Sequence, residues 1–337
     1  MVAEVASTAG PTTPPPETGA ALRSRAPRFI GANWVLVLIL AGLFLLCMIA
    51  IPQFRSWGLI AGMLNSQSLI LLLALVATVV LRSGGFDLSI SQTMVASAAI
   101  TIVLSKAGVP LLVSVSAALG LGAVVGLINA LLVVKVGVDS FVTTLGSYSA
   151  LAGLCYFVTG SSIVSGAPQE LVGVVRAPIL GIPAATWFAW LLALILWYVY
   201  EKTPLGRYLL FIGGNPASAR LAGIRVDRIR IGAYLVSGLL AALVGLVFLG
   251  WFGAVDPGVG SQFMLQPLAA AFLGTTAVVL GRFNALGTVI AVYLLVVGIT
   301  GLQVLGAQTW VTNVFYGLAL IIAVTAAKIA DRRRRVR

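Results

Sequence analysis

The chain has 337 residues, of which 60% are hydrophobic and only 9% are charged. Soluble domains carry about a quarter charged residues, so this composition excludes an ordinary water-soluble domain. The sequence has no histidine and no metal-ligand or nucleophilic-triad spacing, and we therefore expect no metal, no cofactor and no catalytic site. The net charge of +12 does not indicate a nucleic-acid partner, because the basic residues flank apolar stretches as in membrane proteins.

The first 28 residues differ from the rest of the chain. They are rich in Pro, Thr and Ala and lack apolar periodicity, which predicts a disordered cytoplasmic tail over 1–28. A transmembrane domain is expected over 29–330, followed by a short basic cytoplasmic tail over 331–337. Cys47 and Cys155 each lie within apolar sequence and are expected to be buried hydrophobic residues, not a disulfide.

The apolar stretches of the chain can be counted between its charged residues. A transmembrane helix needs roughly 20 apolar residues. The last charge-free run, 283–327, is too long for one crossing, and the polar segment 306–309 divides it. With that division the sequence predicts an all-α polytopic membrane protein of about ten transmembrane helices. The charge-free runs are 29–54, 56–81, 88–105, 107–134, 140–169, 177–200, 231–255, 257–281 and 283–327.

The distribution of basic residues tests this count independently. If both termini are cytoplasmic and ten spans alternate, all but three of the 21 basic residues fall on the cytoplasmic side. The exceptions are Arg55, Lys106 and Arg176. The opposite orientation would violate the positive-inside rule, so we expect cytoplasmic N- and C-termini.

The segment Ser83-Gly84-Gly85-Phe86-Asp87-Leu88-Ser89 separates the second and third predicted spans. A carboxylate within the hydrocarbon costs about 2.5–3.5 kcal/mol or more, and a helix N-terminus offsets part of that cost. Two interpretations of Asp87 remain open at this point. It caps the third span at the interface, or it belongs to a gate or pathway.

The predicted cytoplasmic loop 201–230 is the longest between two spans. Within it, Asn215 suits a helix N-cap, Pro216 the first helical position and Gly223 the position after the end. The pattern predicts a two-turn helix of roughly 10 Å. Because so short a helix is unstable alone, it should be held by packing, and we interpret it as a docking element.

Two further segments interrupt the apolar pattern. On the predicted outer side, Ser261-Gln262-Phe263-Met264 resembles Ser91-Gln92-Thr93-Met94. The two would lie on opposite membrane faces, five spans apart, as in an inverted repeat; chance similarity is the alternative. The segment 281–288 predicts a tight turn between spans eight and nine. Glycines such as Gly120, Gly122 and Gly126 are interpreted as helix-packing positions.

Several motifs, in this order, resemble the permease subunits of bacterial ABC importers for ribose and other simple sugars, a family that includes branched-chain amino acid permeases. They are the Gly-Gly-Phe-Asp-Leu-Ser segment at 84–89, Ser140-Phe141-Val142-Thr143-Thr144-Leu145-Gly146, and Thr203-Pro204-Leu205-Gly206-Arg207 followed by 212–215 and 219–224. The resemblance extends from about the second span to the C-terminus. Before the eighth span, Met264 and Gln266 replace acidic residues common in the family, which weakens any inference about a particular sugar.

The resemblance implies a non-enzymatic permease subunit in a bacterial inner membrane. Two permease subunits, identical or homologous, would form the pore, a solute-binding protein would deliver the sugar, and ATP-binding subunits would dock on the 203–224 loop. No Walker-type loop is present, so this chain cannot hold ATP by that device. The implied coupling residues are Thr203, Leu205, Gly206, Arg207, Gly213, Asn215, Ala219, Arg220, Leu221, Gly223 and Ile224.

We further predict a translocation pathway lined by small and polar groups. Its candidate residues are Asp87, Ser89, Gln92, Asn129, Thr143 and Gln262. The alternatives are a permease for a branched-chain amino acid or nucleoside and a secondary carrier working alone. Sparse intramembrane acids argue against a proton- or sodium-coupled carrier. A scaffold or sensor is disfavoured because the sequence shows no soluble domain.

Overall fold

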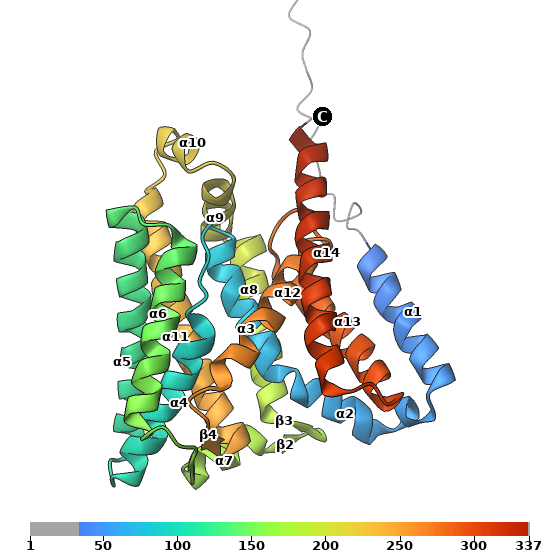
Figure 1. Ribbon diagram of the computed structural model, residues 1–337. Coiled ribbons are helices and arrows are strands. Elements are labelled where there is room, and N and C mark those ends of the chain that lie inside the picture. Colours follow the sequence, from blue (N-terminus) through green and yellow to red (C-terminus); the bar gives the residue numbers. More distant parts are fainter. Residues whose placement is uncertain (1–33, 336–337) are drawn as a thin grey trace, which may run out of the picture. The chain divides into compact units, whose positions relative to one another are not determined.

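The computed structural model describes residues 34–335, with side chains through 325, and this part of the chain is an all-α polytopic membrane protein with two minute sheets (Figure 1). The helices are α1 Val35–Ala50, η2 Pro52–Arg55, α2 Trp57–Ser66, α3 Ser68–Leu81, α4 Ile90–Lys106, α5 Leu111–Ala130, η3 Leu131–Val136, α6 Ser140–Val158, α7 Gln169–Arg176, α8 Ala184–Lys202, α9 Pro204–Gly214, α10 Pro216–Leu221, α11 Val226–Phe252, η4 Val259–Phe263, α12 Leu265–Gly274, α13 Ala285–Val304 and α14 Thr309–Arg335.

The strands are two residues long and pair antiparallel. β1 (Val164–Ser165) pairs with β4 (Ala254–Val255), and β2 (Pro178–Ile179) pairs with β3 (Ile182–Pro183). They lie with α7 at one end of the helices, whereas α9 and α10 lie at the other end (Figure 1). The sheets therefore tie loops together at the end that the charge pattern assigns to the outside.

The helices match the predicted apolar stretches closely. Six helical segments of the described chain are long and apolar enough to cross a membrane, and three shorter ones are apolar: α1, α4 and 309–325. The long run 283–327 is divided where we predicted, because α13 ends at Val304 and α14 begins at Thr309. The predicted span 257–281 differs, since its α12 has ten residues and rises only about 15 Å.

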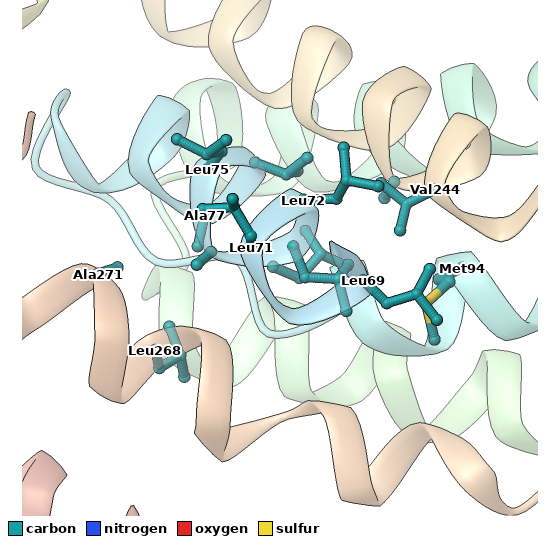
Figure 2. Close-up of a cluster of buried hydrophobic side chains, with 14 of the residues drawn as sticks. Leu69, Leu71, Leu72, Leu75, Ala77, Met94, Val244, Leu268 and Ala271 are labelled. Carbon is teal, nitrogen blue, oxygen red and sulfur yellow. The ribbon is translucent and has the colours of Figure 1, made fainter. Parts of the chain in front are cut away.

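The centre of the molecule is α3, whose residues are all buried. A helix that is apolar on every side must be surrounded by other helices to be shielded. Its leucines meet Met94 of α4, Val244 of α11 and, from α12, Leu268 and Ala271 (Figure 2). The short α12 therefore completes the core around α3.

Close helix contacts depend on small residues, as predicted for two of the three glycines. A methyl group on Gly122 of α5 would collide with the backbone of Gly238 in α11, and one on Gly126 with the backbone of Tyr234. Such contacts let membrane helices approach closely. Gly120 faces open space instead, so it takes no part in this packing.

Several expectations need correction or lie outside the described residues. The amphipathic α7 and the whole of α9 were not predicted. The two similar segments 91–94 and 261–264 do not lie on opposite faces, because the Gln92 side-chain amide donates to the Pro257 carbonyl at 3.2 Å. An extended segment carries the chain inward before α4, which brings them together. Cys47 and Cys155 are free and buried, as expected. The predicted tail 1–28 falls outside the described residues.

Candidate functional site

The predicted docking loop forms a helical hairpin of α9 and α10, which we call the coupling surface (residues 203–224). Its outward side chains include Leu205, Tyr208 and Phe211, and Leu221 at its tip is 92% exposed. Arg207 and Arg220 are exposed beside them. An apolar patch of this kind on an otherwise polar loop is typical of a protein-binding surface.

The residues that we predicted set both ends of α10, and Thr203 starts α9, which we did not predict. The Thr203 hydroxyl caps α9 by accepting from the Gly206 backbone at 3.4 Å. The Asn215 side-chain oxygen caps α10 by accepting from the backbone N–H groups of Ala217 and Ser218 at 3.0 and 3.1 Å. Gly223 adopts φ +77° after its end, a conformation that glycine favours. The predicted short helix is confirmed.

Packing holds the short α10 in place, as expected. Ala219 of α10, Ile212 of α9 and Val226 of α11 are buried in one small apolar cluster, against which Ile224 packs. Arg220 also pairs with Asp227 at 3.0 Å. Since both side chains are about half exposed, this ion pair adds at most about 1 kcal/mol, and the apolar cluster is the main attachment.

Glycines seat α9 directly on the membrane domain. A side chain at Gly206 would collide with the backbone of Tyr200 in α8, and one at Gly213 with the Arg82 carbonyl. The Cα of Gly213 lies 3.2 Å from where a methyl group on Gly84 would stand, and Gly84 has φ +81°. At Gly213, the contact between α9 and the segment before α4 is therefore backbone against backbone.

Arg82 connects the elements that meet where α9 contacts the membrane domain. Its buried guanidinium donates to the carbonyls of Tyr200 (3.2 Å), Gly206 (3.4 Å) and Phe283. It lies 4.5 Å from the Tyr200 ring centroid and 3.8 Å from the Glu201 carboxylate. One side chain thus connects the end of α3 with α8, α9 and the turn before α13.

Asp87 lies in a second polar cluster, deeper among the helices, which we call the Asp87 network (Asp87, Ser89, Asn129, Ser147 and Ser237). One carboxylate oxygen accepts from the Ser89 hydroxyl at 2.6 Å and the other from the Ser237 hydroxyl of α11 at 2.7 Å. The Asn129 amide donates to the Ser89 hydroxyl at 2.9 Å and accepts from Ser147. Buried polar groups this well paired hold their elements in one arrangement.

The irregular backbone before α4 is also satisfied by side chains. Ser140 and Thr144 of α6 accept from the N–H groups of Phe86 and Leu88, both at 3.1 Å, and the Tyr234 hydroxyl donates to the Phe86 carbonyl at 3.0 Å. Non-helical backbone among membrane helices is tolerated only when it is buried in protein with its polar groups paired. This pairing explains how the segment can lie there.

The six predicted pathway residues are therefore not gathered at one place. Asp87, Ser89 and Asn129 share the Asp87 network, whereas Gln92 contacts the segment before η4. The Thr143 hydroxyl is buried and has no hydrogen-bond partner within the described residues, and Gln262 is exposed.

Sequence reasoning missed Arg82, Ser237 and Tyr234. Arg82 was used only for topology, although an arginine directly after an apolar span could have suggested a backbone-binding role. Ser237 and Tyr234 lie inside an apolar stretch, where no local pattern distinguishes a partner of Asp87 from a packing residue.

The helices, the exposed hairpin and the buried polar clusters define a polytopic membrane protein with an exposed apolar hairpin at one end. Comparison with known proteins supplies the family: residues 59–324 match the model for "Branched-chain amino acid transport system / permease component", and the chain belongs to this family. It is thus a transport permease component of a cell membrane and not an enzyme. The family that the sequence motifs indicated is therefore confirmed.

Similar proteins include the ribose import permease protein RbsC of Escherichia coli (strain K12), 31% identical over 81% of this chain and 86% of that protein. The autoinducer 2 import system permease protein LsrD of Photorhabdus temperata is 28% identical over 91% of this chain and 94% of its own length. A probable ABC transporter permease of Sinorhizobium fredii is 30% identical over 88% and 90%. No solved structure matches the chain.

Proposed function

We propose that this chain is the membrane subunit of an ATP-driven importer and carries a simple sugar that a solute-binding protein delivers. Two of its relatives are named for ribose import and autoinducer 2 import, which supports a sugar or sugar-like cargo. The observation on which the proposal depends most is the coupling surface, an apolar hairpin seated rigidly on the core, where a separate ATP-binding subunit could dock.

The proposal includes ten spans with both termini in the cytoplasm. The charge pattern supports this topology, and nine apolar helices of the described chain account for nine of the spans. The tenth would be formed by η4, α12 and the turn that follows. A broken element of this kind is common where a transporter binds or gates its cargo. Two such subunits, identical or homologous, would enclose the pathway.

The pathway proposal separates the polar residues by their surroundings. Gln262 is exposed, so it could meet a sugar without rearrangement. The Thr143 hydroxyl is unpaired within the described chain but buried, so it could bind a sugar only after a movement uncovers it. Asp87, Ser89 and Asn129 satisfy one another, and Gln92 is held by Pro257. These four would contact cargo only when the helices move, which an importer with alternating access requires.

Binding of the ATP-binding subunit tests the docking role. Leu221→Ser changes a side chain that is 92% exposed, so the fold should be unaffected while the subunit binds at least about tenfold more weakly, as at the centre of many interfaces. Phe157→Ser is the matched control, because Phe157 is also exposed, at 83%, on α6 outside the coupling surface. Equal binding by both variants would contradict the docking role.

Uptake into proteoliposomes tests the transport role. Ribose should enter only when the chain is reconstituted with its ATP-binding subunit, the binding protein and ATP. Uptake by the chain alone, driven by a proton or sodium gradient, would show a secondary carrier. Uptake of leucine instead of ribose would assign the cargo named in the family description.

A further inference from the structure

An apolar groove of about 1150 Å³ lies between α8, α9 and α11, with Val79 of α3 among its lining residues. Leu192 and Ile195 line it from α8, and Val236 and Leu240 from α11. Its volume exceeds the roughly 300–1,000 Å³ typical of small-molecule sites. The inner edge of the coupling surface closes one end of the groove through Leu205, Tyr208, Leu209, Ala222, Gly223 and Ile224, and the other lining residues extend beyond it along α8 and α11.

The groove follows one face of α11. Its lining residues there include Arg225, Arg228, Gly232, Val236 and Leu240, which recur at the spacing of a single helix face. From Arg225 to Leu240 the helix axis advances about 22 Å. One leaflet of a bilayer, headgroups included, is about 20–22 Å thick. The groove therefore has the depth of one leaflet.

The charge of the groove is confined to its mouth. Arg225 and Arg228 are its only charged lining residues in the described part of the chain, and both are exposed. The ion pairs found among the described residues use Arg82, Lys135 and Arg220, so neither arginine at the mouth is neutralised by one. A ligand that fits must be anionic at one end and apolar along the rest.

Gly232 lies below the two arginines and leaves the groove open. No atom lies within 4 Å of the position where a Gly232 methyl group would stand. This separates Gly232 from Gly238, two turns further on, which is pressed against the backbone of α5. The space beside Gly232 is available to a ligand.

We propose that this groove binds an anionic phospholipid. Its phosphate would accept hydrogen bonds from Arg225 and Arg228, as guanidinium groups favour phosphate, and an acyl chain would lie past Gly232 toward Leu240. Basic pockets between membrane helices at the cytoplasmic side are a recognised form of headgroup site. A soluble subunit cannot follow the groove into the hydrocarbon, and inorganic phosphate would leave its apolar length empty.

The inference rests on the proposed function only for placing the mouth at the cytoplasmic leaflet. Lipid binding itself can be measured on the purified full chain without any partner, so a failed ATPase-docking test and a failed lipid test are distinguishable.

Native mass spectrometry of the chain, purified in detergent with equimolar palmitoyl-oleoyl phosphatidylglycerol and phosphatidylcholine, gives the direct test. A basic residue near a membrane surface favours an anionic lipid by roughly fivefold, so two predict a preference for phosphatidylglycerol of roughly 30-fold. Arg225→Gln/Arg228→Gln should abolish this preference. Lys202→Gln/Arg282→Gln removes the same charge at exposed residues outside the groove and should leave it intact.

A second variant tests the apolar part of the groove. Gly232→Leu fills the open space without removing charge and should reduce retention of either lipid at least tenfold. Gly153→Leu is its control, because Gly153 is an exposed glycine of α6 that also faces open space. Equal retention of the two lipids by the unmodified chain, or full retention by Gly232→Leu, would overturn the proposal.

The other occupants of the groove give different results. Displacement of the retained lipid by excess inorganic phosphate would show a plain anion site and overturn the proposal. A second copy of the chain seated on the groove would do the same, and Gly232→Cys detects it. Cys47 and Cys155 are buried, so a disulfide-linked dimer formed in membranes would place residue 232 of two copies together.

Discussion

Arg82→Gln should separate binding of the ATP-binding subunit from transport. The buried guanidinium donates to the carbonyls of Tyr200, Gly206 and Phe283, and hydrogen bonds from a charged donor contribute about 1.5–3 kcal/mol each. These values are already net of the cost of burying the charge. Its ion pair with the partly exposed Glu201 adds less than about 1 kcal/mol. Since a glutamine amide can still donate to one of the carbonyls, the net loss corresponds to two of the three bonds, about 3–6 kcal/mol.

Losing these hydrogen bonds weakens the attachment of α9 to the membrane domain, and the outward face of α9 is unchanged. The ATP-binding subunit should bind the variant within about threefold of its normal affinity. Sugar taken up per ATP hydrolysed, measured in the same proteoliposomes, should fall at least tenfold, since 1.4 kcal/mol corresponds to a factor of ten. Arg82→Lys should be intermediate, because an ammonium lacks the planar fork that reaches several carbonyls.

Arg282→Gln is the control for charge, because Arg282 is exposed on the turn that Arg82 contacts. It should behave as the unmodified chain does. Normal uptake per ATP in a folded Arg82→Gln variant would refute the idea that this side chain couples α9 to the membrane domain. Loss of subunit binding would mean that Arg82 shapes the docking surface instead.

Three further substitutions test the arrangement described above. Asn215→Ala removes the cap of α10 and should cost about 1 kcal/mol, measured as a roughly fivefold weaker binding of the ATP-binding subunit in a titration. Ser237→Ala leaves one oxygen of a buried carboxylate unpaired and should destabilise the protein by about 1–3 kcal/mol, seen as a lower midpoint in thermal unfolding; an unchanged midpoint would show that water replaces the hydroxyl. Gly122→Ala forces α5 from Gly238 and should also lower that midpoint, whereas Gly120→Ala, which faces open space, should not.

Much of the fold could be predicted because the membrane imposes simple requirements on sequence. Charged and polar residues are costly within the hydrocarbon, so the apolar stretches mark where helices can lie. The length of the run 283–327 requires a division, and its polar segment 306–309 locates that division. The short α12 could not be predicted this way. The run 257–281 contains no charged residue, and counting charge-free residues does not reveal that much of it forms η4 and a turn.

Sequence alone could predict those parts of the candidate site that depend on residues close together in the chain. Asn215, Pro216 and Gly223 act within a few residues of one another, so sequence alone located α10 and both of its ends. Helix α9 was missed because its glycines suggest a loop, although Gly206 and Gly213 are required by backbone contacts to distant segments. Long-range contacts of this kind leave no local signal.

The contacts between α9 and the core bear on how a movement at the coupling surface could reach the helices. Gly213 touches the Arg82 carbonyl and Gly84, and Asp87 three residues further on is fixed to α11 through Ser237 at 2.7 Å. Packed protein has little free volume to absorb displacement, and backbone contacts lack rotamers that could yield. A shift of α9 must therefore displace the segment before α4 or open a gap beside it. Asp87 binds that segment to α11, and the first turns of α11 lie beside α10. A movement of the hairpin can therefore reach the Asp87 network in two ways, from α9 through the segment before α4 and from α10 through α11.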